Sequence, residues 1–139
     1  MLAALAYRTQ KALRGAPADF DHFRAGPTTR APFELVWHMT GVIGYARTML
    51  HGGDFAPAPL AWLTDEVSRF HETLAALHRD LADGSVHARI RNEKFLQGPL
   101  ADAMTHAGQL ALLRRLFGAP VPSENFICAS IASDNTSPA

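Results

Sequence analysis

The stretch LTDEVSRFHETLAALHRDL, residues 63–81, decides the fold class. Its apolar residues recur alternately every four and every three positions, which places them on one face of a helix at about 100° per residue. This spacing is typical of helices that pack lengthwise in a bundle. Asp65 and Glu66 suit the positive end of the helix dipole, and Gly84 follows its end. The predicted seam consists of Leu63, Val67, Phe70, Leu74, Leu77 and Leu81.

Three further segments have helical spacing and are bounded by glycine or proline. They cover about residues 2–14, 29–51 and 99–117. No run of alternating residues bounded by hairpin turns competes with them. The sequence therefore predicts an all-α fold, an antiparallel four-helix bundle whose elements are joined by short loops.

The length of 139 residues suits one domain with a core of its own. We assign that domain to residues 1–131, with Phe126, Ile127 and Ile131 lying back on the bundle. Residues 132–139 have little to bury, so we expect a disordered C-terminal tail.

The composition excludes several classes of protein. The 13 basic residues balance the 13 acidic residues and are spread along the chain, which argues against a nucleic-acid partner. No stretch approaches the roughly 18 consecutive apolar residues of a membrane span, so we expect no membrane partner. Cys128 is the only cysteine, which rules out an internal disulfide and fits a cytoplasmic location.

Polar side chains interrupt the apolar faces of two of the predicted helices. Asp102 and His106 lie only about 40° apart on the last helix, and Gln109 continues their stripe. His38 falls within about 60° of Leu35 on the helix of residues 29–51, so it too faces inward. His71 and His78 flank the seam of residues 63–81 and read as a half-exposed edge.

Two imidazoles and one carboxylate form a ligand set that suits a divalent Zn, Ni, Fe or Mn ion and leaves coordination positions open. Without a shared cation, burying all three costs several kcal/mol unless each finds its own partner. The alternative is that Asp102 serves only the helix dipole and that each histidine is satisfied by a backbone carbonyl. The spacing leaves both readings open.

Two segments of the sequence are similar to a known family. THAGQLALLRRL, residues 105–116, followed by GAPV at 118–121 and ENF at 124–126, resembles the last helix and tail of the DinB-like family of metal-dependent four-helix bundles, also called DinB/YfiT-like. PFELVWHM, residues 32–39, resembles the second helix of that family.

The resemblance implies a set of metal ligands. His38 and His106 fall on two ligand positions of the family, and Asp102 stands where the family usually has a third histidine. The departure from the family pattern keeps a residue type that can bind a metal.

Four more residues are candidates for the surroundings of the site. Gln109 or Tyr45 could accept a hydrogen bond from a liganding histidine or orient a bound water. Glu124 and Asn125 could return over the mouth of the site with the tail, or they could cap a loop.

The resemblance implies an enzyme whose metal activates a low-molecular-weight thiol cosubstrate or water, as in thiol S-transferases and hydrolases. Because no clear general base accompanies the ligands, thiol transfer to a small-molecule substrate is favoured. The alternative is a non-catalytic metal-binding or dimerising module. The thin apolar stripe of residues 2–14 favours a homodimer in either case.

Overall fold

The computed structural model describes residues 1–83 and 92–137, and helices make up all of its regular structure. Within these residues no strand occurs, so the prediction of an all-α fold is confirmed. The long helices, in chain order, are α1 (Leu2–Leu13), α2 (Pro32–His51), α3 (Leu63–Ala82) and α5 (Ala101–Leu116). Short helical turns are η1 (Ala18–Phe20), α4 (Asn92–Phe95) and η2 (Leu96–Leu100).

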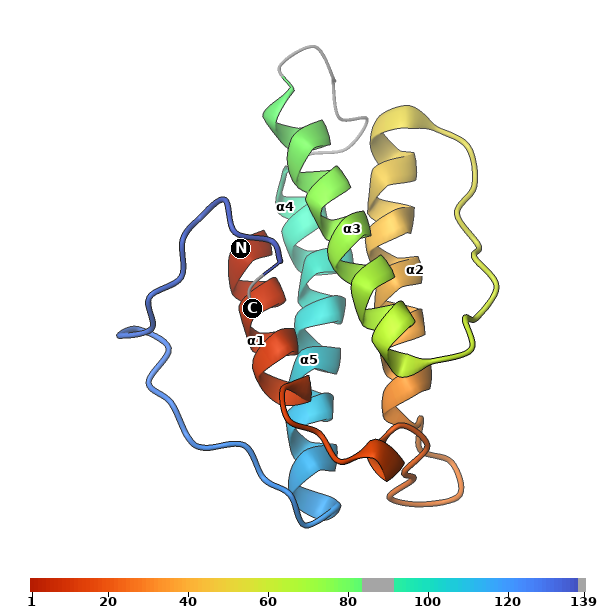
Figure 1. Ribbon diagram of the computed structural model, residues 1–139. Coiled ribbons are helices and arrows are strands. Elements are labelled where there is room, and N and C mark those ends of the chain that lie inside the picture. Colours follow the sequence, from red (N-terminus) through yellow and green to blue (C-terminus); the bar gives the residue numbers. More distant parts are fainter. Residues whose placement is uncertain (84–91, 138–139) are drawn as a thin grey trace.

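The direction of α3 differs from the expected antiparallel arrangement, because α2 and α3 run the same way (Figure 1). Their C-terminal ends are joined by Arg47 and Asp80, whose Nε and Oδ2 atoms lie 2.6 Å apart. The connection of residues 52–62 makes this possible. Eleven extended residues reach about 36 Å, and a 20-residue helix is only about 30 Å long. The connection therefore runs back along the whole of α2.

The four long helices form a ring around the core. α1 packs against α5 and α3, and α2 packs against α3 and α5. Most of the predicted seam of α3 is buried, but Leu81, in the last turn of the helix, is 43% exposed. The fully buried apolar side chains include Leu5, Phe20, Met39, Ile43, Phe70, Leu74, Leu77 and Leu110.

The last helix begins earlier than the sequence predicted. Helical turns start at Asn92, and the chain kinks at Gly98, where φ is −92° and ψ is −106°. Pro99 explains the kink, since it has no N–H to donate and its ring disfavours helical geometry in the preceding residue. α5 proper starts at Ala101, directly before the predicted ligand Asp102.

The C-terminal tail contacts α3 close to the end of the chain. Thr136 is buried, and its carbonyl oxygen lies 2.8 Å from Nδ1 of His71 on α3. The disorder expected for residues 132–139 stays a prediction, and residues 138 and 139 lie outside the described residues. His71 is buried rather than half-exposed because the tail covers it, and this burial lowers its pKa although the Thr136 carbonyl opposes the shift.

The tail also packs against α1, through one of its predicted anchors. The Phe126 ring meets the Tyr7 ring edge-on at 6.4 Å, and the guanidinium of Arg8 lies 3.8 Å from the centre of the Phe126 ring. Ile127, by contrast, is 94% exposed, so its expected packing on the bundle is wrong. Phe126 is therefore one of the side chains that hold this part of the tail against α1.

Helix length and polarity also bear on membrane insertion. Among the described residues, no helix is both long enough and apolar enough to cross a lipid bilayer.

The connection of residues 52–62 packs on α2 at a glycine. A Cβ atom at Gly44 would overlap the ring of Phe55. At Gly41, one turn earlier on the same helix, a Cβ atom would meet open space. Gly44 is therefore the position at which α2 admits the aromatic side chain of the connection.

We expect Gly44→Ala to lower the free energy of unfolding by about 1–3 kcal/mol, because the added methyl group forces Phe55 out of place. Gly41→Ala is the matched control, and it should raise stability by up to about 1 kcal/mol through helix propensity alone. Urea denaturation measures both variants. Adding Phe55→Ala to Gly44→Ala should remove the clash, and the prediction is wrong if Gly44→Ala is as stable as Gly41→Ala.

Candidate metal centre

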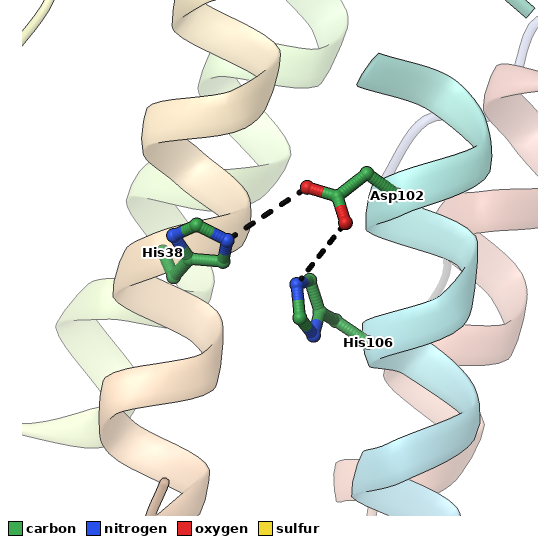
Figure 2. Close-up of side chains that lie close together, drawn as sticks. All are labelled: His38, Asp102 and His106. Atoms are coloured by element: carbon green, nitrogen blue, oxygen red, sulfur yellow. Dashed lines mark ion pairs between the residues drawn. The ribbon is translucent and has the colours of Figure 1, made fainter. Parts of the chain in front are cut away.

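Three side chains converge between α2 and α5. His38 projects from α2 toward α5, and Asp102 and His106 project back from two successive turns of α5 (Figure 2). Each offers one ligand atom, and these three atoms all lie within 4.8 Å of one another. The structure thus brings together the three residues that the sequence singled out as metal ligands.

The separations within the cluster suit a shared ion better than direct hydrogen bonds. Asp102 Oδ2 lies 3.7 Å from His38 Nε2, and Asp102 Oδ1 lies 3.4 Å from His106 Nε2. Hydrogen bonds between such atoms measure about 2.7–3.2 Å. Two ligand atoms bound tetrahedrally at about 2.1 Å from one ion lie roughly 3.4 Å apart. The two measured distances end on different oxygens of Asp102, and with one atom from each residue the cluster spans up to 4.8 Å, so its side chains would have to close in by about 1 Å around a tetrahedral ion.

Gln109 orients His106. Its Oε1 atom lies 2.8 Å from His106 Nδ1, and because an amide oxygen only accepts hydrogen bonds, Nδ1 donates. The lone pair of His106 is then on Nε2, the atom that faces Asp102. Fixing the tautomer through the distal nitrogen is typical of metal-binding histidines.

The three side chains of the cluster differ in their exposure to solvent. His106 is 10% exposed at its side chain, His38 35% and Asp102 49%. Burial lowers the pKa of His38, and the nearby Arg30 and His106 lower it further, while Asp102 acts in the opposite direction. This shift favours the neutral imidazole of His38, which is the form that binds metals.

A large groove opens beside the cluster. It has a volume of about 1670 Å³ and is lined by one face of α2, by residues 55–58 of the connection and by the start of α5. His38 and Asp102 belong to its wall. Trp37 links α2 to the connection of residues 52–62, because its indole N–H donates to the carbonyl of Pro57 at 2.8 Å.

Sequence reasoning missed residues 55–58 and Trp37 as parts of the site. A helix face shows only which residues share a side, whereas the contact of Trp37 with Pro57 depends on the connection running back along α2. Tyr45, a predicted neighbour of the ligands, does line the groove. It is 58% exposed and forms no hydrogen bond with His38, so it belongs to the wall rather than to the ligand support.

Glu124 and Asn125 do not lie over the site. Glu124 accepts hydrogen bonds from the Tyr7 hydroxyl at 2.8 Å and from Lys11 Nζ at 2.6 Å, both on α1. Asn125 Oδ1 accepts from the backbone N–H of Ile127 and so closes a local turn. The tail returns along α1, on the opposite side of the bundle from the connection of residues 52–62 (Figure 1), and Asn125 fits the alternative of a loop cap.

Comparisons of the chain with protein-family models, with curated proteins and with solved structures find no match. The geometry of the cluster and its groove is therefore the basis for assigning a function.

Proposed function

We propose that this protein belongs to the DinB-like family and is a metal-dependent enzyme that acts on a small molecule bound in the groove. The observation that carries the proposal is the convergence of His38, Asp102 and His106 between α2 and α5, at the edge of an open groove. Their distribution, one ligand on the second long helix and two on the last, is the one that the family resemblance implies.

The donor set fits a divalent Zn, Ni, Fe or Mn ion. Two imidazole nitrogens and one carboxylate oxygen are typical ligands of these metals, and three protein ligands leave room for a further molecule. When bound, such an ion lowers the pKa of a coordinated water or thiol. The partial exposure of Asp102 gives a small molecule access to the centre from the groove.

The other acid of the groove favours thiol transfer over hydrolysis. Besides Asp102, the described lining residues include one carboxylate, Glu34. It accepts from the backbone N–H of Ala31 at 2.9 Å and pairs with Arg24, and these contacts lower its pKa. A carboxylate held in this way is a poor proton acceptor at neutral pH. A thiol cosubstrate needs no separate base once its proton has been lost at a metal.

We expect the untagged protein, purified without chelators and supplied with each of the four ions, to bind about one equivalent of metal. His38→Ala and His106→Ala should each lose at least tenfold in affinity, because two ligands do not hold a divalent ion as tightly as three. Asp102→His should retain the metal, since imidazole also ligates. His78→Ala, a histidine of α3 outside the cluster, is the matched control. Elemental analysis and competition with a chromophoric chelator measure these affinities.

Two results would count against the proposal. Absence of metal uptake by the wild-type protein would leave Asp102 as an acid at a helix start and remove the metal centre. Stoichiometric metal without turnover in a panel of thiols with electrophiles, or in a panel of esters and amides, would favour the non-catalytic module. Thiol-dependent turnover that disappears in His106→Ala would instead support the transferase.

A further inference from the structure

The charges on the groove wall point to the chemistry of its ligand. The described lining residues include two acids, and both already have partners. Glu34 is paired with Arg24 and with a backbone N–H, and Asp102 faces the imidazoles of His38 and His106. Glu34 is therefore not available to attract an organic cation, and Asp102 is assigned to the proposed metal centre.

The basic residues of the same wall, unlike the acids, have no hydrogen-bond or ion-pair partner among the described residues. Arg30, just before α2, and Lys94, on α4, are exposed and line the groove. Neither forms a hydrogen bond or an ion pair with any residue that the structure describes. A guanidinium offers paired donors that match the two oxygens of a carboxylate.

The rest of the groove wall is mainly apolar and aromatic. Trp37, Tyr45 and Phe55 line it together with Met49. Trp37 is held by its hydrogen bond to Pro57, and Phe55 is seated against Gly44, so both rings are fixed before any ligand arrives. Fixed aromatic surfaces bind flat apolar groups with little loss of side-chain entropy.

We propose that the groove binds a small organic acid, with its apolar body against Trp37 and Phe55 and its anionic group paired with Arg30. This inference rests on the proposed function in that it names the class of molecule presented to the metal centre. The anion belongs either to the substrate or to a thiol cosubstrate, because both enter the same groove. Arg30 is the residue that determines specificity for the acid.

The test compares two dyes that share an apolar body. 8-Anilinonaphthalene-1-sulfonate carries a sulfonate, and N-phenyl-1-naphthylamine lacks it. The protein is the Trp62→Phe variant treated with chelator, in which Trp37 is the only tryptophan left of the two. Energy transfer from Trp37 then reports dye bound in the groove, and titration gives the dissociation constants.

We expect the sulfonate dye to bind about tenfold more tightly than the neutral dye. Arg30→Gln should raise the dissociation constant of the sulfonate dye about tenfold and leave that of the neutral dye unchanged. Arg115→Gln is the control, because it removes the same charge from an exposed position outside the groove. Competition with a carboxylic acid and with its amide extends the comparison to carboxylates.

Equal affinity for the two dyes, an equal effect of Arg30→Gln and Arg115→Gln, or binding without energy transfer would each overturn the inference. The metal-free conditions separate it from the proposed function. Arg30-dependent binding of the sulfonate dye by a protein that never takes up metal would support the acid-binding groove and contradict the proposed metal-dependent enzyme. Metal uptake without preference for the sulfonate dye would support the metal centre and contradict the acid-binding groove.

Discussion

Replacing Arg114 with methionine is expected to lower the free energy of unfolding by about 3 kcal/mol. Arg114 is only 5% exposed, and its guanidinium donates to backbone carbonyl oxygens alone. These are the carbonyls of Ala12, Arg14, Gly15 and Ala119, at distances of 3.0, 3.2, 3.4 and 2.9 Å. Methionine fills much of the same volume but leaves the carbonyls without a donor.

The position of Arg114 explains the size of this effect. α1 and α5 run in the same direction, so their C-terminal ends lie together at one end of the bundle (Figure 1). The carbonyl oxygens at both ends are unpaired within their helices and carry the negative end of each helix dipole. Arg114 supplies the donors and the positive charge that this junction requires, and burial lowers its pKa.

Chemical denaturation of three variants tests this role. Arg114→Lys should lose less than Arg114→Met, since it keeps the charge but not the fork of donors. Arg115→Met, at the neighbouring exposed position, should change stability by less than about 0.5 kcal/mol. If Arg114→Met and Arg115→Met are equally stable, the junction does not depend on the guanidinium.

Glu66→Ala is expected to destabilise the protein by about 2–4 kcal/mol, because it removes the buried acceptor of Leu60 and leaves the partly buried charge of Arg69 without its partner. Glu66 has 0% exposure, and both its oxygens accept from Arg69 Nη2, at 2.6 and 2.7 Å. Oε1 also accepts from the backbone N–H of Leu60 at 2.7 Å. Arg69 Nη1 in turn donates to the carbonyl of Ala58 at 2.9 Å. The pair therefore fastens the connection of residues 52–62 to α3.

A double variant tests whether the loss comes from the unpaired charge. Glu66→Met with Arg69→Met should recover a large share of the stability lost in Glu66→Ala, because an apolar pair of similar size carries no desolvation cost. Asp65→Ala is the control, an exposed acid in the same first turn of α3, and should cost less than about 1 kcal/mol.

Hydrogen exchange provides a second readout for Glu66. In Glu66→Ala the amide of Leu60 should exchange faster, while amides of α1 should change only with global stability. Unchanged exchange at Leu60 together with a stability equal to that of Asp65→Ala would show that the pair does not hold the connection.

The candidate site could be predicted in part because its ligands lie on helix faces. Asp102 and His106 are one turn apart, so a single helix fixes their relation before any tertiary contact forms. His38 could be placed on an inward face of α2 by the same spacing. Gln109 was named as an orienting group because it lies one turn beyond His106, and the structure puts its oxygen on Nδ1. The groove could not be predicted, since one of its walls belongs to the connection.

Although the spacing alone left the metal site open, the sequence by itself determined the helices and their inward faces. Those features depend on a local period of about 3.6 residues, which any short stretch of chain displays. Tertiary structure alone decided the parallel course of α2 and α3, the burial of Glu66 and Arg114, and the path of the tail along α1. Each of these depends on partners distant along the chain, and local periodicity carries no information about where a connection leads or which charges it covers.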